Sequence, residues 1–452
     1  MKDLIRKYNI PGPRYTSYPT VPYWDDSDFT SAQWEQSLVK SFEESNDTDG
    51  ISLYIHLPFC ESLCTFCACH KRITKQHIVE RPYIDAVLTE WKMYMDLLGK
   101  KPIIRELHLG GGTPTFFSPD NLKYLLENIF SDAVISDRQE FSFEGHPNNT
   151  TTKHLETLYI LGFRRVSFGV QDYDLKVQKA INRLQPFENV QGVTHAARQI
   201  GYESISHDLF FGLPLQTWAS MSEAIEKTKL LKPDRIAFYS YAHVPWKSKV
   251  QRRYTESDLP PAREKWKMFT RGKEIVEAAG MASIGMDHFA LLDDALFDAT
   301  KNGKLHRNFM GYTTTQSKLL IGLGASSISD SWNAFAQNEK TVEAYEEKIR
   351  GGSWPLVNGH CLNEEDQVIR KNILDLMCRH ETLLADELLE PAFVENALQK
   401  LRLLEADGLV QIEDRKIQIT SRGHFFMRNI CAAIDARLWR NKMESDTFSR
   451  AI

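Results

Sequence analysis

The sequence predicts an α/β protein built on an incomplete (β/α)6 parallel barrel, with an N-terminal arm and a C-terminal helical, winged-helix-like domain. Two observations lead to this fold class. Apolar runs rich in β-branched and aromatic residues alternate with segments of helical periodicity between residues 51 and 279, a pattern typical of a parallel sheet covered by helices. Polar residues and glycines also follow directly after the ends of these apolar runs.

Six strand–helix units account for the alternation. The first strand is expected at residues 51–57, where the run Ile-Ser-Leu-Tyr-Ile-His-Leu is typical of a buried strand. The other strands are expected at 103–109, 141–143, 165–170, 204–211 and 235–241. The helices between and after them are expected at 119–130, 153–161, 174–182, 189–200, 221–231 and 263–279.

The residues that follow the strands distinguish a barrel from an open sheet. A barrel gathers such residues on one face, where the loops after its strands converge, whereas an open doubly wound sheet concentrates ligand contacts at one switch point. All six strands contribute, so we favour a barrel, left incomplete so that a bulky substrate can enter from the side. The residues are Cys60, the run Gly110-Gly111-Gly112-Thr113-Pro114, Glu144, Gln171, Asp208 and His243.

Two flanking segments complete the expected domain organisation. Residues 1–50 are rich in turn-forming and aromatic residues and are expected to form an arm that closes over the substrate, while residues 51–361 form the catalytic barrel. Residues 362–452 are expected to contain helices at 365–377 and 395–406 followed by a hairpin at 410–419, an order typical of a winged-helix-like module. That segment has no concentrated basic face, so contact with nucleic acid is not expected.

Composition limits the functional class further. The chain has 452 residues, 42% hydrophobic and 25% charged, which is ordinary for a soluble globular protein. No apolar run reaches the length of a membrane span, and the first residues have neither the pattern of an export signal nor that of a transit peptide. The net charge of −5 gives no general attraction to nucleic acid, so an acidic substrate would have to meet a local group of cations.

Four of the seven cysteines crowd into ten residues, at Cys60, Cys64, Cys67 and Cys69. Such crowding is what a soft metal or an iron–sulfur cluster requires, because several thiolates must converge on one inorganic core. Three of them can hold three corners of a cubane and leave the fourth iron open to a small molecule. Zinc is the main alternative, since four thiolates complete a tetrahedral site, although structural zinc sites usually pair two Cys-x2-Cys knuckles across a longer loop. A disulfide framework is disfavoured by the low cysteine content of a long chain.

The motif Cys60-x3-Cys64-x2-Cys67, with Phe66 before the third cysteine, resembles the radical S-adenosylmethionine superfamily. The glycine run 110–114 matches the segment that binds the methionine end of the cofactor in that superfamily. Within it, nearly the whole chain resembles the family of bacterial oxygen-independent coproporphyrinogen III oxidases (dehydrogenases). The narrower resemblance is carried by Cys69 and by residues 14–20, 54–60, 285–290, 306–314 and 428–431.

The resemblance implies a [4Fe–4S] cluster held by Cys60, Cys64 and Cys67, and two molecules of S-adenosylmethionine. Carboxylates suit ribose hydroxyls, an arginine fork suits a methionine carboxylate, and glycines let the backbone approach the cofactor closely. A plain turn at the glycine run and ordinary hydrogen bonding at the strand ends are the alternatives. The first molecule, on the cluster, would contact Tyr54, Gly111, Glu144 and Ile328, and the second Phe66, Gly112, Thr113, Gln171, Arg183, Asp208 and Ala242.

Cys69 and Arg14 are the two residues assigned to catalysis. Cys69 either lies near the second cofactor or the substrate, or is a structural relic. The implied substrate carries four propionates, which need cations, and each candidate is equally well explained as a solvated surface residue. One departure from the family is His146, which stands where an acid is usual. The candidate cations are Arg14 on the arm, Lys71, Arg72 and Arg307.

The implied function is the anaerobic oxidative decarboxylation of two propionates of coproporphyrinogen III to vinyl groups, giving protoporphyrinogen IX in haem biosynthesis, through hydrogen abstraction by a 5′-deoxyadenosyl radical. We expect a cytoplasmic monomer that takes electrons from a low-potential donor such as flavodoxin or ferredoxin, without a nucleic-acid or membrane partner. The nearest alternative is a haem-trafficking paralogue that keeps the radical machinery but does not decarboxylate. Such relatives generally lack Cys69 and the arm segment 14–19, and this chain has both. A zinc-stabilised binding module would leave the polar strand ends unexplained.

Overall fold

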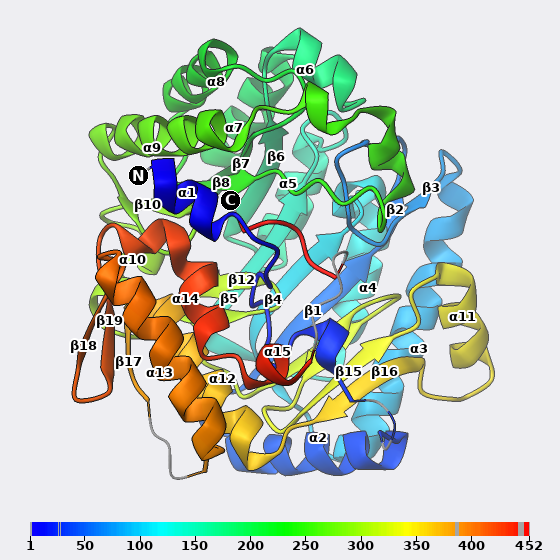
Figure 1. The fold of residues 1–452 in the computed structure, drawn as a ribbon. Helices are drawn as coiled ribbons and strands as arrows, with labels where there is room; N and C mark the ends of the chain where they lie inside the picture. Colours follow the sequence, from blue (N-terminus) through cyan, green and yellow to red (C-terminus); the bar gives the residue numbers. More distant parts are fainter. Residues whose placement is uncertain (1, 26, 28, 385–387, 442–446, 452) are drawn as a thin grey trace.

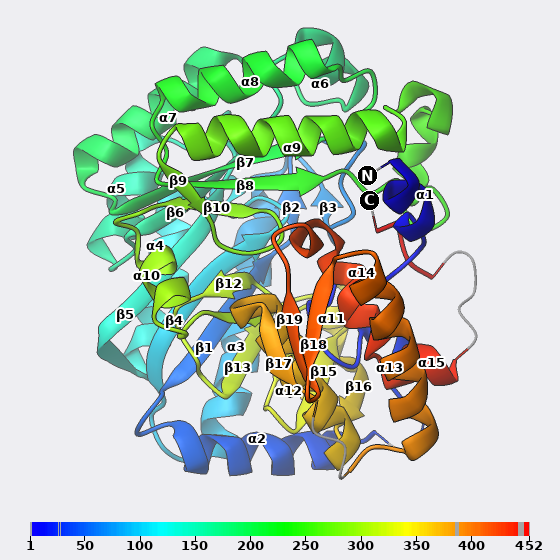
Figure 2. The same ribbon diagram turned by 60° about the vertical axis from the view of Figure 1, so that its left-hand side comes forward.

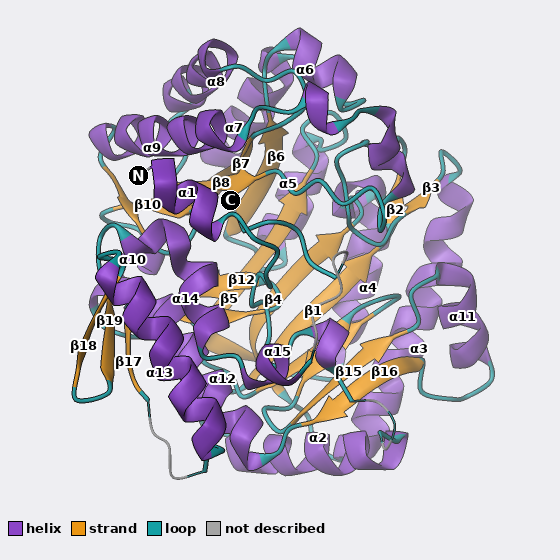
Figure 3. Ribbon diagram, in the orientation of Figure 1, coloured by secondary structure: helices purple, strands orange, loops and turns teal. Residues whose placement is uncertain are grey.

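An open sheet of twelve strands forms the centre of the protein (Figures 1 and 3). The computed structural model describes residues 2–25, 27, 29–384, 388–441 and 447–451. The six predicted strands lie next to one another in chain order and pair in parallel, which confirms the incomplete parallel barrel. They are β1 (Ile51–Leu57), β4 (Ile103–Gly111), β5 (Val134–Gly145), β6 (Arg165–Gln171), β7 (Ser204–Phe211) and β8 (Arg235–Ser240).

Helices cover the outer face of this sheet (Figure 2). The main core lies between the two layers, where Leu53, Ile55 and Leu57 of β1 are wholly buried, as expected of a parallel sheet covered by helices. None of the helices in the described ranges has both the length and the apolar character needed to traverse a membrane. The covering helices are α3 (Glu80–Leu98), α4 (Pro119–Ser131), α5 (Thr152–Ile160), α6 (Leu175–Ala180), α7 (Phe187–Ile200), α8 (Trp218–Leu230) and α9 (Ala262–Ala278).

Short local signals set the ends of these helices. Gly99 ends α3 with φ +61° and Gly201 ends α7 with φ +110°, left-handed conformations that glycine adopts without steric cost. The side chain of Asp174 accepts backbone hydrogen bonds at the start of α6, which satisfies N–H groups that the first turn leaves free. These caps fix the lengths of the loops that carry the polar residues of the barrel face.

The sheet extends beyond the predicted strands at both edges. β13 (Leu319–Leu323) pairs in parallel with the free side of β1, and three antiparallel strands follow it, while β10 (His288–Leu291) and β9 (Met281–Ser283) continue antiparallel from β8. The two outermost strands do not pair with each other, so the sheet stays open. The three antiparallel strands after β13 are β14 (Ile328–Asp330), β15 (Ala334–Asn338) and β16 (Leu356–Cys361).

The remaining elements of the region up to Cys361 are short, except for one helix of the N-terminal segment. Helix α2 (Ser31–Ser45) contacts β13, β15 and β16, so it supports the sheet rather than the arm, although its residues fall in the segment expected to be turn-rich. The short hairpin strands β11 (His306–Asn308) and β12 (Gly311–Thr313) form a separate pair. The others are α10 (Ala295–Lys301), α11 (Val342–Arg350), β2 (Phe59–Cys60) and β3 (Arg72–Ile73).

The C-terminal part consists of helices with a small antiparallel sheet, in agreement with the winged-helix-like expectation. The sheet has the order β17-β19-β18, and its apolar face shares one core with Leu4 and Ile5 of helix α1 (Lys2–Tyr8) and with Tyr15 and Tyr18 of the arm. The elements are α12 (Glu364–Arg379), β17 (Glu381–Leu383), α13 (Pro391–Ala406), β18 (Val410–Glu413), β19 (Lys416–Ile419), α14 (Met427–Ala433) and α15 (Ala436–Arg440).

The two ends of the chain lie side by side (Figures 1 and 2). Pro11 forms a β-bridge with Arg450, the Gly12 N–H donates to the Ser449 carbonyl at 3.1 Å, and the Ala451 N–H donates to the Ile10 carbonyl at 2.8 Å. The arm is therefore held in place by the C-terminal segment.

Candidate active site

The four clustered cysteines lie on a loop that is held by strand pairing at its base and by hydrogen bonds in its middle. β2 pairs with β3, so that Cys60 lies opposite Ile73 across the base of the loop. The Thr65 N–H donates to the Ile181 carbonyl at 2.9 Å, and the Asn182 amide donates to the Leu63 carbonyl at 2.8 Å. Because the β2–β3 pair and the end of α6 both hold the loop, its thiols have defined positions.

Cys60, Cys64 and Cys67 line one cavity of about 270 Å³ at the barrel face, together with the solvent-exposed Cys69. The Cys60 Sγ lies 3.2 Å from the Thr113 hydroxyl. Burial raises the pKa of Cys60 to about 11, whereas a hydrogen bond from the Cys69 thiol lowers the pKa of Cys67 to about 6.

The arrangement of the thiols bears on the choice between a cluster and zinc. In the described part of the chain, no three His, Cys, Asp or Glu side chains surround a single ion position. The three thiols instead border a common cavity, which fits the separate corners of a larger inorganic core better than one shared tetrahedral ion.

The glycine run at the end of β4 packs directly against the start of the cysteine loop. Gly111 has φ +116°, and a Cβ placed there would lie 2.9 Å from the His56 ring, while a Cβ on Gly112 would lie 2.4 Å from the Pro58 carbonyl oxygen. The Gly112 N–H also donates to the Leu57 carbonyl at 2.9 Å. The glycines therefore have a packing role, and at the same time Gly111, Gly112 and Thr113 line the cavity.

The next three strands and the loop after α6 place polar side chains around the same cavity. Glu144 is the penultimate residue of β5, Gln171 ends β6, Asp208 lies in β7 and Arg183 follows α6. Burial raises the pKa of Asp208 to about 6, and its carboxylate accepts a hydrogen bond of 2.8 Å from Ser167.

Gln171 and Arg183 carry hydrogen-bonding groups suited to a bound ligand. Gln171 has φ +69°, and its buried Oε1 has no hydrogen-bond partner among the described residues. Such an atom is rare in a folded protein, and here it belongs to a residue that lines the cavity. The Arg183 guanidinium donates to the Gly169 carbonyl and lies 3.9 Å from the Cys64 Sγ. The cavity thus presents an acceptor, a carboxylate and a cation beside the thiols, which fits a zwitterionic cofactor with ribose hydroxyls.

The other predicted cofactor residues divide between the cavity and its margin. Phe66 lines the cavity, with its ring 5.3 Å from that of Phe210. The Tyr54 ring stacks on His108, and its hydroxyl lies 3.1 Å from the His56 Nδ1. Ala242 is outside the lining, but Gln251 donates to the carbonyls of both Ala242 and Phe66. Ile328 begins β14 and packs beside Trp24 and Phe335, also outside the lining.

A second cavity of about 240 Å³ lies between the arm, β8, the hairpin β11–β12 and the C-terminal part. Arg14 and Arg307 both line it, as two of the four candidate cations. Arg14 donates to the Ser240 carbonyl at 2.8 Å. Arg307 is buried, lies over the Tyr312 ring at 4.6 Å, and has two guanidinium nitrogens without a partner among the described residues. The pKa of Asp287 is lowered, against the effect of burial, by its hydrogen bond to His288 and by charges that include Arg307, so Arg307 has an acidic neighbour. Its two guanidinium nitrogens without a partner can still donate to an anionic ligand, and the cavity is suited to one.

The other two candidate cations lie elsewhere. Lys71 lines the first cavity, where its Nζ is within hydrogen-bonding distance of the Cys67 and Cys69 carbonyls. Arg72 is exposed and forms an ion pair of 3.1 Å with Glu343 of α11, outside the lining of both cavities. The hypothesis that Arg72 binds a propionate is therefore not supported by its position, because a solvated, paired cation gains little from a further partner.

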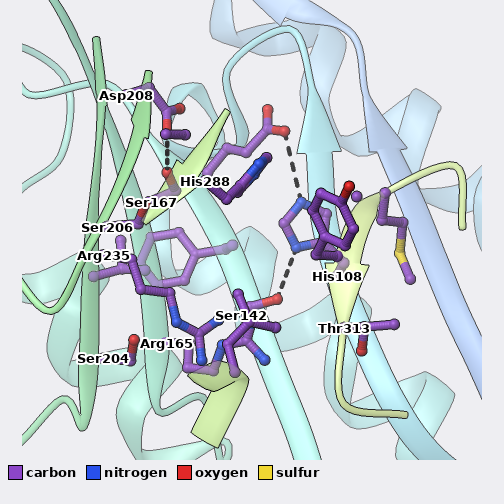
Figure 4. Close-up of a pocket in the computed structure, with 18 of the residues that line it drawn as sticks. His108, Ser142, Arg165, Ser167, Ser204, Ser206, Asp208, Arg235, His288 and Thr313 are labelled. Atoms are coloured by element: carbon purple, nitrogen blue, oxygen red, sulfur yellow. Dashed lines mark hydrogen bonds and ion pairs between the residues drawn. The ribbon is translucent and has the colours of Figure 1, made fainter. Parts of the chain in front are cut away.

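A third, smaller cavity of about 130 Å³ occupies the interior of the barrel (Figure 4). His108 lies between two other lining residues, with its Nδ1 2.8 Å from the Ser142 hydroxyl and its Nε2 3.6 Å from the Glu144 carboxylate. Deeper in the barrel, Arg235 pairs with Asp294 at 2.7 Å. Tyr239 lines all three cavities. Its side chain therefore lies where the first cavity, the second cavity and the interior of the barrel meet.

Several site residues were not assigned a role from the sequence. Arg428 lines the second cavity and donates to the Pro13 carbonyl at 2.9 Å and to the Gly12 carbonyl. Asp287 and His288 face the same cavity, 3.1 Å apart. Both sets fall in segments that carried the family resemblance, which was the available signal, whereas nothing in the sequence marked Tyr239 and Ser167.

His146 lines the first cavity as a neutral imidazole. Its burial, together with the Arg183 charge, holds its pKa well below the usual range. The Nδ1 atom accepts a hydrogen bond of 3.1 Å from the Asn148 N–H. The residue therefore supplies no negative charge in place of the acid that is usual in the family, and Glu144 is the nearby carboxylate that remains.

Comparisons with known proteins match the whole chain. The model of the radical SAM superfamily matches residues 54–228. The oxygen-independent coproporphyrinogen III oxidase of Pseudomonas aeruginosa is 37% identical over 459 residues, covering 100% of this chain and 98% of the relative. The enzyme of Escherichia coli with the same name is 35% identical over 454 residues, covering 99% and 98%. The solved structure of coproporphyrinogen III oxidase from Escherichia coli, a radical SAM enzyme, aligns with a TM-score of 0.89 at 33% identity, covering 97% of this chain and 99% of that one.

Proposed function

The chain belongs to the family of oxygen-independent coproporphyrinogen III oxidases, and on that premise we propose that it converts coproporphyrinogen III into protoporphyrinogen IX. Two propionate side chains are oxidatively decarboxylated to vinyl groups without O₂, as a step of haem biosynthesis. The observation that carries the proposal is the position of Arg307, which has two guanidinium nitrogens without a partner among the described residues, in a cavity that meets the three-thiol cavity at Tyr239.

Cys60, Cys64 and Cys67 would hold a [4Fe–4S] cluster. With one iron free of protein ligands, the cluster and S-adenosylmethionine together supply the 5′-deoxyadenosyl radical that abstracts a hydrogen atom. Arg183, near the Cys64 sulfur, offsets part of the thiolate charge. Cys69 stays outside the ligand set, exposed at the rim of the cavity, and is proposed to act near the second cofactor or the substrate.

Two molecules of S-adenosylmethionine are proposed to bind around the first cavity. The backbone of Gly111 and the Glu144 carboxylate would meet the amine and ribose of the first molecule, beside Tyr54 and Ile328. For the second molecule, the unpartnered Oε1 of Gln171 would accept from a donor and Arg183 would bind the methionine carboxylate. Its other proposed contacts are Phe66, Gly112, Thr113, Asp208 and Ala242.

The tetrapyrrole is proposed to lie in the second cavity and to extend toward Tyr239. Arg307 and Arg14 would bind propionates that are retained or not yet processed, and Arg428 would keep the arm in place above them. In each decarboxylation the 5′-deoxyadenosyl radical would take a hydrogen atom from the β-carbon of a propionate. The bond between the α-carbon and the carboxylate then breaks, CO₂ departs, one electron passes to an acceptor and a vinyl group remains.

The proposal extends to the domains of the chain, its cellular location, its oligomeric state and its partners. We propose residues 1–50 as the arm, apart from helix α2, which packs on the sheet, residues 51–361 as the catalytic barrel and residues 362–452 as the C-terminal domain. We propose a cytoplasmic monomer that takes electrons from a low-potential protein such as flavodoxin or ferredoxin, without a nucleic-acid or membrane partner.

An anaerobic assay tests the function directly. The reconstituted protein is incubated with S-adenosylmethionine, dithionite and coproporphyrinogen III, and the products are separated chromatographically. Protoporphyrinogen IX, 5′-deoxyadenosine and methionine are expected. Binding of haem without loss of CO₂ would instead identify a haem-trafficking paralogue, and zinc near one per chain, without iron and sulfide, would identify a structural zinc site.

A further inference from the structure

A run of cations lies on the surface beside the cysteine loop, although the whole chain has a net charge of −5. Residues 246–253 read Trp-Lys-Ser-Lys-Val-Gln-Arg-Arg and contain no acid. The side chains of Lys247, Lys249, Arg252 and Arg253 are exposed, and Trp246 is 39% exposed. We call residues 246–253 the basic segment.

The basic segment is bound to the backbone of the cysteine loop. The buried side chain of Gln251 donates to the Phe66 carbonyl at 3.0 Å, and the Ser248 hydroxyl donates to the Cys67 carbonyl at 3.4 Å. Just after the segment, the Tyr254 hydroxyl donates to the Thr65 carbonyl at 3.1 Å. Figure 1 shows this green part of the chain, after β8, running beside β2. The exposed cations therefore cover the outside of the loop that carries the three proposed cluster ligands.

Further cations border the same surface. Lys340 is close enough to Lys247 to contribute to the lowered pKa of that lysine, which burial causes in the main. Lys71 contacts the Cys67 and Cys69 carbonyls from the cavity side. We call the cations of the basic segment, together with Lys71 and Lys340, the basic collar.

The basic collar is poorly neutralised by its surroundings. Within the described part of the chain, the side chains of Lys249 and Arg253 form no hydrogen bond or ion pair, and Arg252 donates only to the Pro245 carbonyl. Glu256 and Asp258 follow the segment in the sequence, and the Asp258 carboxylate accepts from the Thr255 N–H. Glu343, three residues after Lys340, is paired with Arg72. Unpaired like charges produce a local positive potential that attracts an anionic partner, and exposed Trp and Arg are the residues that most often contribute to binding at protein interfaces.

We propose that the basic collar is the docking surface for an acidic one-electron carrier protein, an inference that rests on the proposed function. Each formation of 5′-deoxyadenosine and methionine consumes one electron, which the reduced carrier loses, so the carrier must approach the thiols. The tetrapyrrole is a poorer occupant, because Lys249 and Arg253 are absent from the described lining of all three cavities, whereas Arg14 and Arg307 line the second.

The test compares two reductants in the holoenzyme. The variant Lys249→Glu/Arg253→Glu reverses two cations of the collar, and Lys301→Glu/Lys304→Glu makes the same change in net charge at the exposed end of α10, on the opposite side of the molecule (Figure 1). With reduced flavodoxin as the probe, the collar variant should need about tenfold more carrier for half-maximal turnover at low salt. With dithionite, both variants should retain wild-type turnover, since a small reductant needs no docking surface.

A binding measurement separates docking from catalysis. Calorimetry with oxidised flavodoxin should give a dissociation constant about tenfold higher for the collar variant than for the α10 variant, and about 0.3 M salt should remove the difference. An equal loss with both reductants would overturn the proposal and assign the collar to substrate or cofactor binding. Wild-type affinity and turnover in the collar variant would also overturn it. Failure of the wild-type enzyme with dithionite would count against the proposed function instead.

Discussion

The first cavity, which the cysteine thiols line, and the second cavity, which Arg14 and Arg307 line, are built in different ways. The first is lined by residues between 60 and 239 that follow or end successive parallel strands, so the topology of the sheet itself brings them together. The second combines the arm, the hairpin β11–β12, residues between 424 and 428 and Ala451 with β8 and β10, so it exists only where the two ends of the chain meet. On the proposed function, the cofactor would therefore bind where the order of the strands gathers the side chains, whereas the substrate would bind where long-range contacts join the terminal segments.

The largest expected effect separates the four thiols of the first cavity. Cys64→Ala should lose the cluster and reduce turnover to background, because three thiolates are the minimum that the proposed site offers. Cys69→Ala should keep iron and sulfide near four per chain, since Cys69 is exposed at the rim. Iron and sulfide analysis after anaerobic reconstitution measures both, and loss of iron from the Cys69 variant would break the distinction between ligand and neighbour.

Arg307→Met is the next largest change and affects the second cavity alone. Removing the buried, unpartnered cation should lower turnover of coproporphyrinogen III on the order of a hundredfold, with cluster content unchanged. The same change should alter the free energy of unfolding by no more than about 1 kcal/mol, because the avoided desolvation cost of Arg307 and its lost attraction to Asp287 oppose each other. Denaturant titration and steady-state kinetics check the two parts. A destabilised variant would show that Arg307 is a structural residue.

Arg14→Ala tests whether the arm takes part in substrate binding. Loss of one charged donor should reduce turnover about tenfold and raise the KM for the tetrapyrrole more than it lowers kcat, while iron content stays at the wild-type level. Deleting the whole arm is a less specific test, because Leu4, Ile5 and Tyr8 belong to the C-terminal core. Unchanged kinetics in the point variant would contradict closure of the arm over the substrate.

Gly111→Ala probes the rigidity of the first cavity. A methyl group would meet the His56 ring at 2.9 Å on a backbone with φ +116°, so we expect a loss of about 1–3 kcal/mol in the free energy of unfolding. Gly192→Ala in α7 is the matched control, since a Cβ there meets no atom within 4 Å and the change should stabilise the helix by about 0.5–1 kcal/mol. Equal effects at both positions would mean that the close approach at Gly111 has no energetic consequence.

The smallest expected effect concerns the pH dependence of stability. Burial raises the pKa of Asp208 to about 6, so the folded state binds this proton more tightly than the unfolded chain. The resulting stability is fully present below about pH 4 and is lost as the pH rises through about 6. Asp208→Asn should therefore be about 1 kcal/mol more stable than wild type at pH 7, after allowance for partial solvent exposure, and equally stable near pH 4. A difference independent of pH would point to the lost Ser167 hydrogen bond instead.

The same comparison explains what the sequence could predict. The six parallel strands have long apolar runs and strong turn signals, so their positions, and with them Cys60, Glu144, Gln171 and Asp208, could be placed on one face. The strands β9 to β16 span only three to six residues each, too short to give a clear period. Helix α2 lies in a segment whose Pro and aromatic residues obscured its periodicity.

The second cavity was harder to predict from the sequence, and the reason is physical. Its residues lie hundreds of positions apart, and cations have no periodic signature. Arg14 and Arg307 were found through the family resemblance, whereas Arg428 needed the structure, because its role is to hold the Gly12 and Pro13 carbonyls. The hypothesis that Arg72 binds the substrate is not supported, because Arg72 pairs with Glu343 at the surface and lies outside the lining of both cavities.

The most direct test of the whole account follows a single hydrogen atom. Coproporphyrinogen III that carries deuterium at the β-carbons of its propionates is incubated anaerobically with the reconstituted enzyme, S-adenosylmethionine and dithionite. The masses of the products are then measured by mass spectrometry. Hydrogen abstraction from the substrate should give 5′-deoxyadenosine that carries one deuterium and a tetrapyrrole that has lost two molecules of CO₂. Unlabelled 5′-deoxyadenosine beside an unchanged tetrapyrrole would contradict it.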